Sequence, residues 1–108
     1  MSESFPKPKA RSETAPLLVD VATGRKPADL VVRNGRWVNV HSGEIIPGTD
    51  LAIVAGRFAY CGPDASHAIG PKTKVVDAHD RYLVPGLCDG HMHVESGMVT
   101  VTEFCRAV

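Results

Sequence analysis

Short runs of β-branched and aromatic residues, each ended by turn residues, fill the middle of this 108-residue chain and limit what it can fold into. Between residues 29 and 84 the runs recur at the close spacing that is typical of antiparallel β-domains. Asn34-Gly35 separates two of them and tolerates positive φ, which favours a type I′ hairpin turn there. A second hairpin is predicted around Gly56. The predicted strands are 30–33, 36–40, 51–55, 57–61, 73–77 and 82–84.

The N-terminal residues have a different composition. Residues 1–16 hold three prolines, several charges and one aromatic side chain, so they bury too little apolar surface to offset the entropy lost on ordering. We therefore expect a disordered arm there. Residues 17–28 begin with an apolar run that is long enough for one or two helical turns, and Gly24 and Pro27 would end it. This part is predicted to be a short helical or linker segment.

After Pro85-Gly86 the pattern changes to a single strand followed by a helix. Thr100 and Glu103 have the spacing of a capping box, and apolar residues then recur on one helical face. A strand, a loop and a helix make one βα unit, and a closed (β/α)8 barrel needs eight over ~250 residues. The predicted fold class is therefore mixed β and α/β. A small N-terminal β-domain over 29–84 precedes 85–108, the first strand and the start of the first helix of an incomplete TIM-like barrel.

Charge and cysteine content exclude several function classes. Twelve basic and twelve acidic residues give a formal net charge of zero, so no basic surface is expected for nucleic acid. No apolar run approaches the ~20 residues of a membrane span, and the N-terminus does not read as a secretion signal. The three cysteines, Cys61, Cys88 and Cys105, are odd in number and widely spaced, which favours reduced thiols. We expect a cytoplasmic protein without nucleic-acid or membrane partners.

The predicted strand after Pro85-Gly86 carries a candidate metal site. Because side chains alternate along a strand, Asp89, His91, His93 and Glu95 share one face. Residues two apart lie about 6–7 Å from each other, and two imidazoles so placed can converge on one divalent ion. Nitrogen and carboxylate ligands accept zinc, manganese or iron, and such an ion activates water near neutral pH.

The bare His-x-His pair is weak by itself, since a chain of this length with five histidines would contain one by chance in roughly one case in five. Histidines that merely bond at a surface strand end are the alternative interpretation. His93-Val94-Glu95 also matches half of the cytidine-deaminase zinc signature, but the Pro-Cys-x-x-Cys half is missing. The neighbouring carboxylates, the Pro-Gly and the capped helix favour the metal site. The other histidines are expected to be solvated: His41, His67 and His79.

Residues 85–93 read Pro-Gly-Leu-Cys-Asp-Gly-His-Met-His. This string resembles the amidohydrolase superfamily, whose small β-domain precedes a TIM-like barrel with Pro-Gly-x-x-Asp-x-His-x-His on its first strand. Residues 94–100, with 24–30 and 39–45, are similar to the adenine deaminase family within it. Gly97 stands where many relatives are expected to have serine, which is a minor departure.

The resemblance implies hydrolysis of adenine to hypoxanthine and ammonia by metal-activated water. His91 and His93 correspond to the first two metal ligands, and manganese is the expected divalent metal, with iron or zinc as alternatives. Asp89 is expected to orient a ligand imidazole or to close the barrel floor. Glu95 corresponds to the glutamate that follows the pair, with a role near the metal or at the substrate. The expected partner is a small purine, and a homo-oligomer is compatible with the resemblance.

The family's remaining ligands and its catalytic acid and base are expected on later strands, beyond the end of these residues. The 108-residue chain alone is therefore expected to be inactive. Two other functions stay open from the sequence. One is a different amidohydrolase that acts on cyclic amides, and the other is a non-enzymatic β-rich interaction module in which the histidines are incidental.

Overall fold

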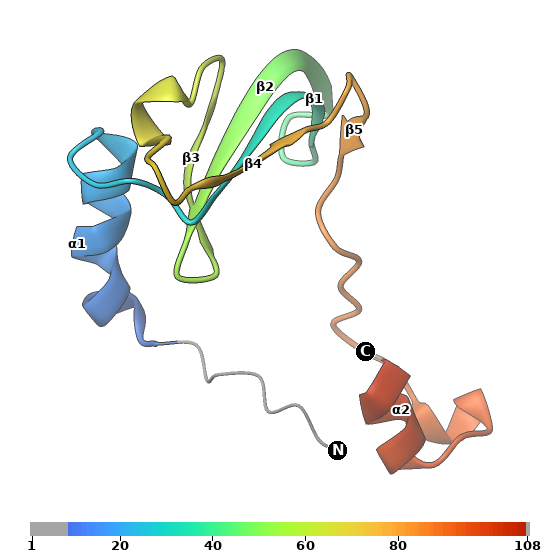
Figure 1. The fold of residues 1–108 in the computed structure, drawn as a ribbon. Coiled ribbons are helices and arrows are strands. Elements are labelled where there is room, and N and C mark those ends of the chain that lie inside the picture. The colour runs from blue at the N-terminus through green and yellow to red at the C-terminus, as the bar shows by residue number, and fades with distance from the viewer. Residues whose placement is uncertain (1–8, 108) are drawn as a thin grey trace.

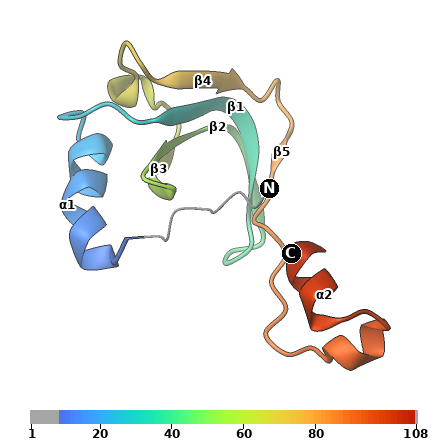
Figure 2. The same cartoon turned by 60° about the horizontal axis from the view of Figure 1, so that its bottom comes forward.

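A computed structural model of the chain describes residues 9–107, except for the side chain of Glu95. It shows a small mixed α/β domain in which a five-stranded sheet is covered on one face by a helix (Figure 1). The C-terminal residues lead away from the sheet to a second, short helix (Figures 1 and 2). No helix within residues 9–107 has the length and apolar content needed to cross a membrane.

The sheet has the order β3-β2-β1-β4, and β5 also pairs with β1. β2 is antiparallel to both β1 and β3, as the β-domain pattern predicts, whereas β4 and β5 run parallel to β1. The expectation of an antiparallel domain is therefore wrong for these two strands. Parallel strands need a crossover, which the residues between β3 and β4 provide with the 3-10 helix η1 (Ser66–Ala68). The strands are β1 (Leu30–Asn39), β2 (Glu44–Val54), β3 (Arg57–Gly62), β4 (Lys74–Asp77) and β5 (Tyr82–Leu83).

Helix α1 (Arg11–Ala22) corrects the prediction for the N-terminal residues. Residues 11–16 are helical rather than part of a disordered arm, and residues 1–8 of that arm lie outside the described residues. The helix forms because tertiary burial outweighs its unfavourable composition: Thr14 and Val21 are buried, and Leu17 packs against the core. It ends where expected, with Gly24 at a φ of 81° just beyond it.

The core lies between α1, η1 and one face of the sheet, and its side chains are small. Alternation along β1 and β2 directs Val31, Ala52 and Val54 toward the helix. The opposite face keeps larger apolar side chains partly exposed, among them Phe58, which is 67% exposed. Because a core of such small side chains gives limited hydrophobic stabilisation, polar contacts contribute a larger share of the stability of the fold. The buried cluster is Val21, Ala28, Val31, Ala52, Val54, Ala65 and Ala68.

Asn34-Gly35 does not form the predicted hairpin. β1 runs unbroken through it, and the pairing register with β2 shifts on both sides of Gly35, which is a β-bulge. Asn34 does adopt the positive φ that was predicted, at 59°. A side chain at position 35 would require the Leu83 side chain to move, because its Cβ would lie 2.3 Å from Leu83 Cδ1. The predicted hairpin around Gly56 is confirmed: β2 and β3 pair antiparallel across a turn in which Gly56 has a φ of 70°.

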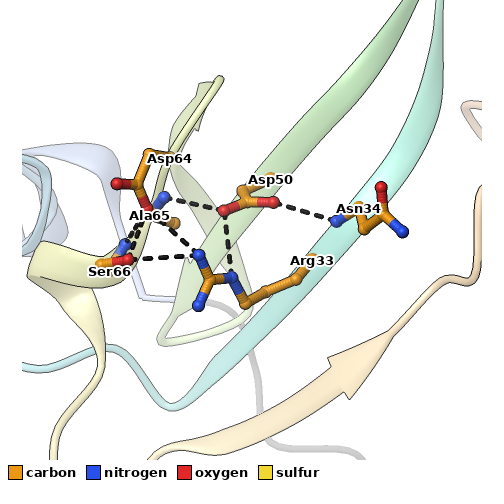
Figure 3. Close-up of polar contacts among 6 residues, drawn as sticks. All are labelled: Arg33, Asn34, Asp50, Asp64, Ala65 and Ser66. Carbon is orange, nitrogen blue, oxygen red and sulfur yellow. Dashed lines mark hydrogen bonds and ion pairs between the residues drawn. The ribbon is translucent and has the colours of Figure 1, made fainter.

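A buried carboxylate stabilises this bulge. Asp50, on β2, is 4% exposed, and its Oδ1 accepts the backbone N–H of Asn34 at 2.9 Å. Its Oδ2 accepts the backbone N–H of Ala65 at 2.9 Å and a bond from Arg33 Nε at 3.3 Å (Figure 3). The Arg33 guanidinium also bonds Asp64 and Ser66. One side chain thus joins β1, β2 and the loop that begins the crossover.

Replacement of Asp50 by asparagine tests this network. Asparagine has only one side-chain oxygen, so its NH2 group would face one of the two backbone N–H groups, of Asn34 and Ala65, that Asp50 now accepts. We therefore expect the free energy of unfolding to fall by about 2–4 kcal/mol. Asp20→Asn is the matched control, because Asp20 makes only surface ion pairs with Arg25 and Lys26. Its effect should stay below about 1 kcal/mol. Urea unfolding followed by circular dichroism measures both, and equal effects of the two substitutions would contradict the role given to Asp50.

An ion pair between β1 and the turn that joins β4 to β5 has a consequence for the dependence of stability on pH. The Arg36 Nη2–Asp80 Oδ2 distance is 2.7 Å, and this hydrogen bond lowers the pKa of the Asp80 carboxyl below its usual value. A lowered folded-state pKa means that the stability from this pair is present at neutral pH and is lost as the pH falls through the acid range, below about pH 4. In Asp80→Asn the free energy of unfolding should therefore fall less steeply between neutral and acid pH. Glu44→Gln, an exposed site, is the control, and an unchanged slope in Asp80→Asn would contradict this assignment.

Candidate metal site

The residues that carry the candidate site follow β5 and do not form the predicted strand. From Pro85 to His93 the chain has no regular secondary structure, and it then enters the short 3-10 helix η2 (Val94–Gly97). The strand that the sequence predicts directly after Pro85-Gly86 is therefore absent from this structure. A strand is held by hydrogen bonds to neighbouring strands, and no described strand lies beside this segment (Figure 1). Leu87, which was predicted to share the inner face of that strand with Asp89, His91 and His93, is fully exposed.

His91 and His93 nevertheless come together. Their Nε2 atoms lie 3.1 Å apart, and their ring centroids are 4.9 Å apart with the planes at 69°. His93 has an extended backbone, with φ −111° and ψ 104°, and it caps η2. Both side chains are exposed. The convergence that was predicted from strand alternation is therefore present locally, although the strand is not.

This geometry fits two ligands of one metal ion. Two nitrogens that each bind an ion at about 2.1 Å can be separated by at most about 4.2 Å, and the observed 3.1 Å lies within that limit. Within residues 9–107, however, no group of three or more histidine, cysteine, aspartate or glutamate side chains is arranged to hold a metal. The described residues thus provide a pair of ligands, which is fewer than a stable site requires.

Of the two carboxylates predicted to lie near the metal, the structure describes the side chain of Asp89 but not that of Glu95. Asp89 Oδ1 accepts the backbone N–H of His91 at 3.0 Å, so it constrains the main chain at the first histidine. This contact is with the backbone rather than with an imidazole, which was its predicted partner. The backbone of Glu95 lies within η2, and its side chain is outside the described residues.

Helix α2 (Val101–Ala107) begins where the capping pattern predicts. Thr100 Oγ1 accepts the backbone N–H of Glu103 at 3.2 Å, which is the first half of a capping box. The Glu103 carboxylate pairs with Arg106 Nη1 at 2.7 Å. Val101 and Cys105 on the predicted apolar face are exposed, Phe104 is half-buried, and Val108 lies outside the described residues. No residue of α2 is buried, so its apolar face is unpartnered in the described part of the chain.

The remaining histidines are exposed, as expected: His41, His67 and His79. The three cysteines are free thiols. Two arginines that no sequence motif singled out, Arg11 and Arg57, line one hollow although they are far apart in the sequence. Only the folded structure brings them together, since local patterns carry no information on contacts between distant residues.

Comparison with known proteins identifies the relatives of this sequence. No family model matches the chain. It is 82% identical over 102 residues to an adenine deaminase of Mesorhizobium japonicum, which covers 94% of this chain and 17% of that protein. It is 81% identical to adenine deaminase 3 of Rhizobium meliloti, in a match that covers 90% of this chain and 16% of that protein. It is 62% identical to an adenine deaminase of Ruegeria sp., in a match that covers 89% of this chain and 16% of that protein. These residues belong to the adenine deaminase family.

The family resemblance predicted from the sequence is thereby confirmed. The chain spans about a sixth of the length of the adenine deaminases that it matches. Among solved structures, a crystal structure from Bacillus thuringiensis is 28% identical, with a TM-score of 0.48 over 63% of this chain and 92% of that one.

Calorimetric titration of the chain with Mn²⁺ or Zn²⁺ at neutral pH tests the paired histidines. We expect weak binding, with a dissociation constant of about 100 µM or more, because two imidazoles leave most coordination positions to water. The signal should disappear in the His91→Ala, His93→Ala double variant. It should persist in the His41→Ala, His79→Ala double variant, which removes two exposed histidines elsewhere. Tight binding by the unmodified chain would show that the site is more complete than the described residues indicate.

Proposed function

We propose that this chain is part of an enzyme that hydrolyses adenine to hypoxanthine and ammonia. The high identity to adenine deaminases over nearly all of its residues is the observation that carries this proposal. In the net reaction the C6–N bond of adenine breaks, the oxygen of water becomes bonded to C6, and the amino group leaves as ammonia. The purine is therefore the proposed small-molecule partner.

His91 and His93 are the proposed metal ligands of that enzyme. Their Nε2 atoms point toward each other at 3.1 Å, so little rearrangement is needed for both to bind one ion. Asp89 supports the pair by holding the backbone N–H of His91. Glu95 is proposed to act near the metal or the substrate, on the basis of its place after the pair. A divalent metal would supply Lewis-acid activation of water near neutral pH; manganese is proposed from the family resemblance, with iron or zinc as alternatives.

Residues 85–108 are proposed to form the first strand and the start of the first helix of a TIM-like barrel, after a β-rich part that ends at residue 84. The capped α2, the unpartnered apolar face of that helix and the exposed Leu87 support this, because each would be covered in a complete barrel. The 108-residue chain by itself is proposed to be inactive, since two imidazoles cannot complete a catalytic metal site.

The proposed compartment is the cytoplasm. Its support is that Cys61, Cys88 and Cys105 are free and exposed, as thiols of a reducing compartment are. A homo-oligomer is compatible with the exposed apolar side chains of the open sheet face and of α2. The balanced charge supports a function without nucleic-acid or membrane partners.

Ammonia release from adenine by the longest in-frame protein that contains these residues tests the proposal. His91→Ala and His93→Ala should each lower kcat/KM by more than about a hundredfold. Removal of a metal ligand is expected to cost more activity than removal of a residue that only hydrogen-bonds a ligand, which typically costs about 10–100-fold. His41→Ala, in the exposed turn after β1, should leave the rate unchanged. Hydrolysis of a cyclic amide such as dihydrouracil without turnover of adenine would overturn the proposal in favour of another amidohydrolase activity.

A further inference from the structure

A hollow with a volume of about 470 Å³ lies between helix α1 and the turn that joins β2 to β3, apart from the histidine pair. Its size is within the ~300–1,000 Å³ of small-molecule sites. One wall comes from the helix and the other from the turn and the start of β3. The lining residues are Arg11, Ala15, Leu18, Gly56, Arg57 and Phe58.

Local structure explains both walls. Arg11, Ala15 and Leu18 have the spacing i, i+4 and i+7, so they share one face of α1. Leu18 also packs against the buried core, which ties this face to the sheet. On the other side, the left-handed backbone of Gly56, with a φ of 70°, forms the tight turn that leads directly into Arg57 and Phe58. The two walls thus belong to regular elements rather than to a free loop.

The charges at the hollow are unbalanced. Elsewhere in the domain, Arg33 and Arg36 each pair with an aspartate. Within residues 9–107, neither Arg11 nor Arg57 makes an ion pair, and no acidic side chain of those residues lines the hollow. Arg57 Nη2 donates only to the carbonyl oxygen of Lys9, at 3.0 Å, and its buried Nε has no hydrogen-bond partner. A guanidinium held partly out of water against a neutral carbonyl favours a nearby anion.

The rest of the lining is apolar. Ala15 and Leu18, on the face of α1 that also carries Arg11, supply hydrocarbon surface beside the two cations. We propose that this hollow binds a small amphipathic carboxylate, with its head group between Arg11 and Arg57 and its apolar body against Ala15 and Leu18. The planar fork of each guanidinium matches a carboxylate, and the apolar wall selects against an anion that has no hydrocarbon part.

Octanoate is the probe for this site, followed by chemical shifts of backbone amides in the 108-residue chain. Octanoate should shift the amides of Gly56, Phe58 and Leu18 in a saturable way. Acetate, which has the charge without the apolar body, and 1-octanol, which has the body without the charge, should each bind about tenfold more weakly or less. Arg11→Gln and Arg57→Gln should weaken octanoate binding by a similar factor. Arg25→Gln is the matched control, because Arg25 is an exposed arginine beyond the other end of α1.

Several results would overturn the proposal. Equal binding of octanoate and 1-octanol would mean an apolar surface without a carboxylate site. Competition by inorganic phosphate at the same concentration as octanoate would mean a general anion site. An equal loss in Arg25→Gln would mean that net charge alone is responsible. If circular dichroism shows that Arg57→Gln does not fold, the same measurement is made on Arg11→Gln, because Arg11 is exposed. Unchanged octanoate binding in Arg11→Gln would then reject the site.

Discussion

The buried carboxylate of Asp50 joins parts of the chain that the thin core alone would hold weakly. An ionised group out of water is stabilising only when its oxygens are satisfied, and here donors come from β1 and from the loop after β3. The bond to Asn34 holds the bulge in β1, and Gly35 in that bulge leaves the space that Leu83 of β5 fills. The position at which the chain leaves the sheet toward His91 and His93 therefore depends on a side chain in another strand. Fold and candidate site are coupled through this series of contacts.

Much of the sheet follows from local sequence patterns. The runs of β-branched residues mark the strands, and the left-handed residues at Ala55 and Gly56 turn β2 into β3 as predicted. Asn34-Gly35 shows the limit of such patterns. Its tolerance of positive φ was identified correctly, but a bulge and a hairpin turn both use that conformation. The choice depends on Asp50, which lies 16 residues further along the chain.

Helix α1 and the parallel strands show the same limit. The composition of residues 11–16 disfavours order, yet burial of Thr14 and Val21 against the sheet makes the segment helical. For the candidate site, the two imidazoles converge as predicted, with their Nε2 atoms 3.1 Å apart, although the strand on which that prediction rested is not formed in the described residues. A strand at this place would need a neighbouring strand to pair with, and no strand of residues 9–107 pairs with this segment. The hollow between Arg11 and Arg57 has no local signature at all, since it arises from packing between distant segments.

The short spacing of the two imidazoles has a consequence for how a metal would be captured. Once an ion is bound by one of them, the other is a tethered ligand whose effective concentration is set by a single intervening residue, Met92, and is far above that of any free donor. As the proposed ligands, the two histidines would therefore form a chelating arm on an exposed segment. Metal affinity of such an arm would depend on how far its backbone is already ordered, so binding of an ion and ordering of this segment would be coupled.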